Sequence, residues 1–318
     1  MKIALVIFIT LALAGCALLS LHMGVIPVPW RALLTDWQAG REHYYVLMEY
    51  RLPRLLLALF VGAALAVAGV LIQGIVRNPL ASPDILGVNH AASLASVGAL
   101  LLMPSLPVMV LPLLAFAGGM AGLILLKMLA KTPQPMKLAL TGVALSACWA
   151  SLTDYLMLSR PQDVNNALLW LTGSLWGRDW SFVKIAIPLM ILFLPLSLSF
   201  CRDLDLLALG DARATTLGVS VPHTRFWALL LAVAMTSTGV AACGPISFIG
   251  LVVPHMMRSI TGGRHRRLLP VSALTGALLL VVADLLARII HPPLELPVGV
   301  LTAIIGAPWF VWLLVRMR

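Results

Sequence analysis

The chain has 318 residues, of which 61% are hydrophobic and only 11% are charged. Soluble domains carry about 25% charged residues, so this composition excludes an ordinary soluble protein and indicates a chain that lies mostly in lipid. The formal net charge of +10 would suggest nucleic acid in a soluble protein, but in a membrane chain it is first a topology signal. The four cysteines lie far apart in or beside apolar runs, so neither disulfides nor a zinc site are expected.

The first apolar run contains LAGC, from Leu13 to Cys16, and allows two interpretations. A bacterial lipoprotein signal peptide ends in such a motif, and its cysteine then becomes a lipid anchor. After Cys16 the chain continues with the apolar residues ALLSL, where a lipoprotein turns to a polar tether, and only Lys2 precedes the run as a positive charge. The sequence therefore favours an uncleaved first membrane span, with the lipoprotein as the alternative.

Apolar runs of about 20 residues, the length that a helix needs to cross a bilayer, follow one another along the chain. They lie near 3–22, 54–76, 86–103, 107–130, 138–158, 181–200, 226–243, 246–262, 268–287 and 298–315. The eighth is the weakest, because Pro254 and Arg258 interrupt it, and we expect a short, buried, broken helix there. We predict an all-α polytopic membrane protein with about ten transmembrane helices in a single domain, 1–318.

Basic residues give these spans an orientation. With the N-terminus in the cytoplasm, most Lys and Arg residues fall in the inner segments, as the positive-inside rule requires. The acidic residues sharpen the difference: the whole formal charge of +10 then lies on the inner side, and the outer side is neutral. We therefore expect both termini in the cytoplasm and no nucleic-acid partner.

The sequence lacks the motifs of common membrane enzymes. No GxxxxGK[ST] phosphate loop, HExxH motif or pair of carboxylates at catalytic spacing is present, and the seven histidines are scattered. We expect no catalytic residue, metal site or cofactor in this chain. A proton- or sodium-coupled carrier usually keeps acids near the middle of its spans, whereas Asp154 and Asp284 lie near the outer ends. A secondary, ion-coupled transporter of a small chelate remains the alternative class.

Four long stretches carry a family resemblance: EYRLPRLLLALFVGAALAVAGVLIQGIVRNPLASPDILGV, LGDARATTLGVSV, GPISFIGLVVPHMMR and ADLLARIIHPPLELPVGVLTAIIGAPWFVWLL. In this order, and over nearly the whole chain, they resemble the BtuC/FecCD family, the permease subunits of type II ABC importers for vitamin B12, haem and iron–siderophore complexes. The resemblance implies a BtuC-like type II ABC importer permease fold, with a pathway between two subunits. At full length it points to the ferric citrate permeases, so the expected function is passage of an iron(III) chelate, ferric citrate, through a bacterial inner membrane.

The same resemblance implies the partners. A homologous permease subunit would complete a heterodimer, cytoplasmic ATPase subunits would bind ATP and Mg²⁺, and a periplasmic binding protein would deliver the substrate. Iron is expected to cross as its citrate chelate, because the chain offers no carboxylate-rich cage for bare ferric iron.

Three arginines near the outer ends of spans gain a role from the resemblance. Arg51 and Arg54 flank Pro53, and Arg288 ends ADLLAR. The family implies that all three dock carboxylates of the binding protein, for which bidentate arginine is well suited. The alternative is interfacial anchoring to lipid headgroups. Asp284 lies four residues before Arg288 on the same helix and is expected to hold its guanidinium group in place.

A coupling loop is expected at about 203–222. Gly210 and Gly218 would break a long helix into short pieces, and small residues let another backbone approach closely. The family implies that these pieces sit in a cleft of the ATPase, whereas the alternative is a solvated connection. The coupling residues predicted are Gly210, Asp211, Ala212, Arg213 and Gly218.

The stretch RNPLASPD is a turn built on two prolines and an asparagine, and it contains the predicted cytoplasmic gate residues Asn78, Pro79 and Leu80. The alternative is that this turn only connects two membrane helices. Next comes GVNHAASLA, which departs from the small residues usual in the family. Asn89 and His90 are predicted to line the pathway, with a buried core histidine as the alternative. Gly69–Pro79 and Gly244–Pro254 share one Gly-to-Pro interval, which leaves an internal repeat open.

Overall fold

The computed structural model describes residues 2–131, 134–161 and 164–316, and within these ranges all the regular secondary structure is helical. The long elements are α1 (Lys2–His22), α3 (Leu52–Val76), α4 (Val88–Leu102), α5 (Leu111–Ala130), α6 (Pro135–Ser159), α8 (Trp180–Ser197), α11 (Val221–Cys243), α12 (Ile249–Thr261), α13 (His265–Ile289) and α14 (Val298–Arg316). Shorter elements are α2 (Ala32–Thr35), η1 (Tyr45–Arg51), η2 (Val108–Val110), α7 (Val164–Leu171), η3 (Leu198–Phe200), α9 (Cys201–Leu207) and α10 (Asp211–Thr216). Each predicted apolar run coincides with one long helix, which confirms the all-α fold.

Most of the long helices have the length and composition of membrane spans. Among the described residues, 7 helices are long and apolar enough to cross a bilayer, and α4 and α14 are shorter apolar helices. The 25 residues of α3 extend about 37 Å at 1.5 Å per residue, more than the roughly 30 Å of hydrocarbon. Helix α12 has only 13 residues, and Pro254 lies inside it and is buried. It is short and largely buried, as expected, but it is one continuous helix rather than a broken one.

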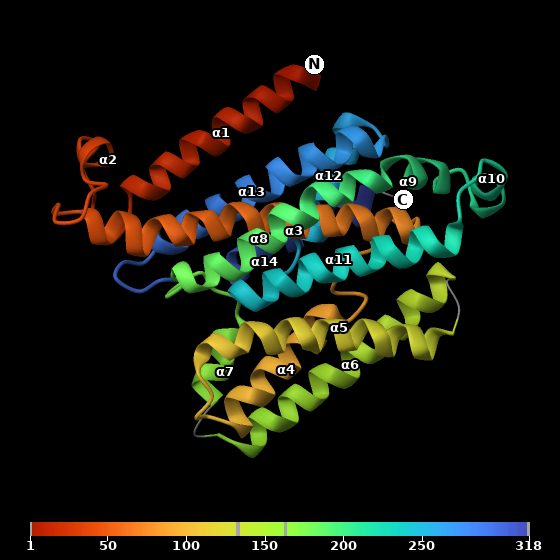
Figure 1. The fold of residues 1–318 in the computed structure, drawn as a ribbon, viewed down its shortest axis with the longest axis horizontal. Coiled ribbons are helices and arrows are strands. Elements are labelled where there is room, and N and C mark those ends of the chain that lie inside the picture. The colour runs from red at the N-terminus through yellow and green to blue at the C-terminus, as the bar shows by residue number, and fades with distance from the viewer. Residues whose placement is uncertain (1, 132–133, 162–163, 317–318) are drawn as a thin grey trace.

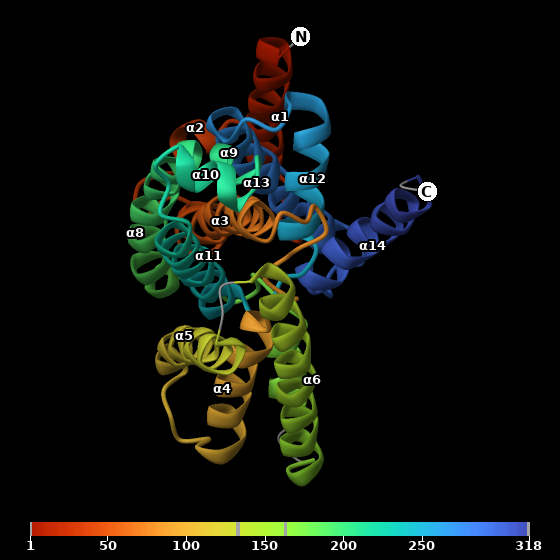
Figure 2. The ribbon, with the colours of Figure 1, turned by 90° about the vertical axis from the view of Figure 1, so that its right-hand side faces the viewer.

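Helix α3 forms the centre of the molecule. It packs against α13, α11, α12 and α8, and 83% of its apolar window is buried (Figures 1 and 2). Two glycines make the closest approaches possible: a Cβ at Gly62 would collide with the carbonyl oxygen of Gly276 on α13, and one at Gly69 with that of Gly250 on α12. Small residues of this kind let membrane helices pack backbone against backbone.

A second group of helices lies beside this centre. Helices α4, α5 and α6 pack on one another, and α7 packs on α4 (Figure 2). Helix α11 joins the two groups, because it contacts both α3 and α5. The outer helices expose much apolar surface: only 17% of the apolar window of α1 and 28% of that of α6 are buried. Lipid or other membrane subunits would cover these faces.

The two ends of the long axis carry different elements. Helix α2 lies at one end and α9 and α10 lie at the other, and we call them the α2 end and the α10 end (Figure 1). The LAGC stretch lies within α1, a continuous helix that packs against α13. A continuous apolar helix is what we expect of a first membrane span.

The proposed internal repeat has no counterpart in the backbone. Gly69 lies inside α3 and Pro79 beyond its end, whereas Gly244 precedes α12 and Pro254 lies inside that helix. The shared interval therefore joins two different local structures.

Candidate functional site

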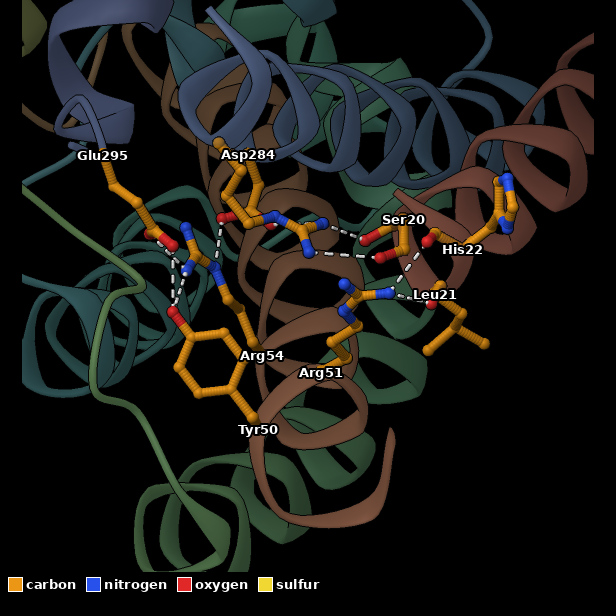
Figure 3. A network of polar contacts seen from close by, with 9 residues as sticks. Ser20, Leu21, His22, Tyr50, Arg51, Arg54, Asp284 and Glu295 are labelled. Carbon is orange, nitrogen blue, oxygen red and sulfur yellow. Dashed lines mark hydrogen bonds and ion pairs between the residues drawn. The ribbon is translucent and has the colours of Figure 1, made fainter. Parts of the chain in front are cut away.

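A network of charged side chains lies buried at the α2 end (Figure 3). Arg54 Nε donates to Asp284 Oδ1 at 2.7 Å, and Arg54 Nη1 donates to Glu295 Oε2 at 2.6 Å. The hydroxyl group of Tyr50 donates to the other Glu295 oxygen at 2.9 Å. Arg288 Nη2 lies 3.3 Å from Asp284 Oδ2, which confirms the expected pair four residues apart. We call these residues, together with Arg51 and Ser20, the buried arginine network.

The rest of this network caps the end of α1. Arg51 donates to the carbonyl oxygens of Leu21 and His22, the latter at 3.0 Å, and Arg288 Nη1 donates to the carbonyl oxygen of Ser20 at 3.1 Å. The last carbonyls of a helix have no partners within the helix, and cations interact favourably with that end. The two arginines thus fasten α1 to α3 and α13.

The predicted docking arginines are therefore not at the surface. The exposed fraction is 3% for Arg51, 2% for Arg54 and 2% for Arg288. Their guanidinium groups face partners within the chain, because three cations share two carboxylates and the carbonyls of α1. Docking of a binding protein through these residues would first require release of these internal contacts, and their role in docking stays a prediction. Neither interpretation of these arginines, as lipid anchors or as docking residues, predicted that all three lie in one internal network.

The segment before η1 carries the exposed charges of the α2 end. Arg31 and Arg41 are exposed, and His43 Nδ1 lies 2.9 Å from Asp36 Oδ2. The hydrogen bonds of Asp36 with His43 and Thr35 lower the pKa of that carboxyl group. Arg31 and Arg41 are thus the residues of this segment that offer guanidinium groups to an approaching protein.

The predicted coupling segment forms two short helices at the α10 end. Helix α9 continues the line of α8 through η3, and α10 follows after Gly210. Ala212 and Arg213 on α10 are exposed, and the neighbouring Leu209 and Leu217 are exposed by 51% and 50%. An exposed apolar patch on a projecting segment marks a protein contact.

Both predicted glycines of this segment have left-handed backbone conformations. The φ angle is +103° at Gly210 and +87° at Gly218, a region that residues with a Cβ adopt at a cost. No atom lies within 4 Å of a Cβ placed on Gly218. Its role within this chain is therefore backbone geometry rather than close packing.

Asp211 contacts two residues that the sequence analysis did not single out. It pairs with Arg225 on α11 at 2.9 Å and with Arg77, directly after α3, at 3.1 Å. A second contact joins α9 to α13, where Asp205 Oδ1 lies 2.6 Å from His265 Nδ1. An acid between two glycines was the available signal in LGDARATTLGVSV, but Arg77 lies too far away in sequence to be paired with it.

The predicted gate residues form a compact turn after α3. The backbone N–H of Leu80 donates to the side-chain oxygen of Asn78 at 2.9 Å. Asn78 is exposed, whereas Pro79 and Leu80 are half-buried.

The predicted pathway residues lie together on a cavity of about 270 Å³. Its lining comes from four parts of the chain: Asp84, Asn89, His90, Ser93, Ala150, Thr153, Asp154, Leu171, Pro245 and Ser247. Asn89 is 4% exposed, and its Nδ2 donates to Asp84 Oδ1. Its Oδ1 atom is buried without a hydrogen-bond partner. Asn89 and His90 thus face a polar hollow rather than an apolar core.

The described residues contain no group of three or more His, Cys, Asp or Glu side chains that could hold a metal ion.

Comparison with known proteins gives a consistent result. The FecCD transport family model matches residues 10–316. The chain is 99% identical over 318 residues, all of both chains, to the Fe(3+) dicitrate transport system permease protein FecD of Escherichia coli (strain K12). It is 44% identical to the Fe(3+)-citrate import system permease protein YfmE of Bacillus subtilis (strain 168), over 97% of this chain and 94% of the relative. A solved inward-facing conformation of a metal-chelate type ABC transporter superposes with a TM-score of 0.87 at 30% identity, over 99% of this chain and 100% of the other.

Proposed function

Because the chain belongs to the FecCD transport family, we propose that it is the inner-membrane permease subunit of a bacterial ABC importer that translocates iron(III) citrate. The identity of the substrate is inferred from one observation, the 99% identity, over the full length of both chains, to a ferric dicitrate permease. A helical bundle with spans of bilayer length supports passage through a membrane. The chain is a transport subunit and is embedded in the membrane.

Two partners are proposed from the two ends of the molecule. The segment 203–222 contacts an ATPase subunit, a role supported by the exposed residues Ala212, Arg213 and Leu217. ATP and Mg²⁺ belong to that subunit. A binding protein that carries the chelate docks at the α2 end, where Arg31 and Arg41 are exposed. This orientation puts both termini and α10 in the cytoplasm, in agreement with the positive-inside rule.

A second permease subunit completes the pathway in this proposal. The polar cavity at Asn89 and His90 lies between the two groups of helices, and the gate turn Asn78–Leu80 leads into it along the chain. A heterodimer with a related but non-identical subunit is proposed, because two different Fe(3+)-citrate import permease proteins of Bacillus subtilis are similar to this chain.

Uptake into right-side-out membrane vesicles, or into proteoliposomes with ATP enclosed on the α10 side, tests this function. Radioactive ferric citrate should accumulate only when ATP, the ATPase subunit and the loaded binding protein are all present. A protonophore should leave the rate unchanged. Uptake that stops with the protonophore while ATP remains would instead favour an ion-coupled secondary transporter.

A further inference from the structure

One carboxylate at the α10 end is shared between two helices. Asp211 Oδ1 and Oδ2 accept hydrogen bonds from Arg225 at 2.9 and 3.0 Å, and Oδ1 also lies 3.1 Å from Arg77 Nη2. Arg225 belongs to α11, and Arg77 directly follows α3. The first residue of α10 thus joins the ends of two helices that form the centre of the bundle.

The two contacts of Asp211 differ in kind. The Arg225 side chain is 5% exposed and binds both carboxylate oxygens, a bidentate geometry that fixes direction as well as distance. The Arg77 side chain is 36% exposed and makes a single contact with the same carboxylate. A single, partly exposed ion pair contributes little to stability. The Arg225 pair is therefore suited to anchoring α10, and the Arg77 pair to forming and breaking.

Arg77 also determines where the predicted gate turn begins. Its φ angle is +55°, in the left-handed region that residues other than glycine seldom adopt. The next residues are held by their own contacts: Leu80 N–H donates to Asn78 Oδ1 at 2.9 Å, and Ala81 N–H donates to the Asn78 carbonyl at 3.1 Å. Pro79 stiffens the turn further. Because these contacts hold the turn rigid, a displacement of Arg77 would also displace residues 78–81.

Helix α10 is bounded by two glycines with left-handed backbone conformations. It lies between Gly210 and Gly218, which have φ angles of +103° and +87°, and a glycine absorbs changes of backbone angle easily. Its exposed face is the one that the proposed ATPase contact would engage.

We propose that Asp211 is a positioning residue that transmits movement of α10 to the gate turn 77–81 through its ion pair with Arg77. The bidentate pair with Arg225 binds the same carboxylate to the start of α11, so this end of α11 would move together with α10. The inference rests on the proposed function, because it requires that an ATPase subunit displace α10. It adds a residue-by-residue connection between the ATPase contact and the turn after α3.

The first test compares transport with ATP hydrolysis in the complete transporter in proteoliposomes. Asp211→Asn removes both ion pairs of this carboxylate, whereas Arg77→Gln removes only the pair with Arg77. Each should lower ferric citrate uptake about 10-fold or more, within the usual range of coupling between two sites, while hydrolysis stimulated by the loaded binding protein continues. Asp211→Glu and Arg77→Lys keep the charges and should retain most uptake. Arg160→Gln, an exposed charge that has no part in this connection, is the matched control.

The second test follows the gate turn itself. Leu80→Cys is labelled with a membrane-impermeant maleimide in a chain whose Cys148 and Cys201 are replaced by serine. Labelling should change when ATP is added, and Arg77→Gln should remove that change without preventing the labelling.

The outcomes separate this inference from the proposed function. If the parent transporter shows no ATP-dependent ferric citrate uptake, the proposed function fails. If the parent transports but Asp211→Asn and Arg77→Gln keep the parental ratio of uptake to hydrolysis, the connection through Asp211 is overturned. A parallel loss of hydrolysis and uptake, or nucleotide-dependent labelling that survives in Arg77→Gln, also overturns it.

Discussion

Single residues at the two ends of the molecule show how charge is used inside a membrane protein. At the α2 end, Asp284 lies between two guanidinium groups and is only 1% exposed. Charges in such a place are retained only when each has a partner, because removal from water is costly. Asp284 therefore contributes to stability through the cations that it neutralises.

Asp284→Asn should destabilise the purified chain strongly. The change leaves Arg54 paired with Glu295 alone and removes the carboxylate that Arg288 contacts, and breaking a buried pair costs about 3–5 kcal/mol. Thermal unfolding in detergent measures the loss. Glu49→Gln removes an exposed carboxylate from the nearby η1 and should leave the midpoint unchanged. Equal midpoints for the two variants would show that the network is not needed for stability.

Arg51→Glu combined with Arg54→Glu does not test docking alone. Both side chains are buried beside or among charged partners, so the double variant should fold poorly before any docking is measured. Arg31→Glu with Arg41→Glu changes exposed side chains instead and should weaken capture of the loaded binding protein without lowering the unfolding midpoint. Binding affinity in reconstituted membranes at two salt concentrations measures it. Unchanged affinity at both concentrations would remove these two arginines from the docking surface.

Gly218 tests the role of backbone geometry in the coupling segment. Its φ angle of +87° costs a residue with a Cβ roughly 1–2 kcal/mol, and asparagine less than valine. Gly218→Val should abolish uptake while membrane insertion remains intact, and Gly218→Asn should keep part of the uptake. Uptake assays together with the amount of inserted protein decide this. Normal transport by the valine variant would show that neither the angle nor a contact at this residue matters.

At the scale of helices, close approach is the main constraint. Gly69 on α3 lies against the backbone of Gly250 on α12, so a larger residue would push the two helices apart. Gly69→Val should lower the yield of folded protein severely. Gly15→Val on α1 has nothing within 4 Å of its Cβ and is the control. Monodisperse yield in size-exclusion chromatography is the measurement, and equal yields would contradict the packing described.

The helices that the sequence predicted well are those whose whole surface is apolar. Runs such as 54–76 are recognised by length and composition alone, and α3 indeed spans Leu52–Val76. The short helices α2, η1 and α7 were missed, because they lie between spans and have no long apolar run. Asp211 was predicted as a coupling residue, a role that stays a prediction, and its contacts with Arg77 and Arg225 were not predicted, since only the fold brings these residues together. The same reason hid the pairing of Arg54 with Asp284 and Glu295, which are 230 and 241 residues away.

For the whole molecule, exposed apolar faces indicate surfaces that lipid or another subunit covers in the assembled transporter. Leu140, Leu158 and Ile304 are more than half exposed on α6 and α14. Expressed without a second permease subunit, the chain should be unstable or inactive. Co-purification in mild detergent should recover a related, non-identical permease with the ATPase subunit. A stable complex that contains only this permease, and that transports, would show a functional homodimer.

The most direct test of the account is uptake by the complete transporter in proteoliposomes, with iron and citrate carrying different radioactive labels. The account predicts that both labels enter together, that entry requires ATP inside the proteoliposome, on the α10 side, and that an ion gradient cannot replace the nucleotide. Entry of iron without citrate would contradict passage of the chelate. Entry of both labels without ATP would contradict the assignment of this chain as a permease subunit of an ABC importer.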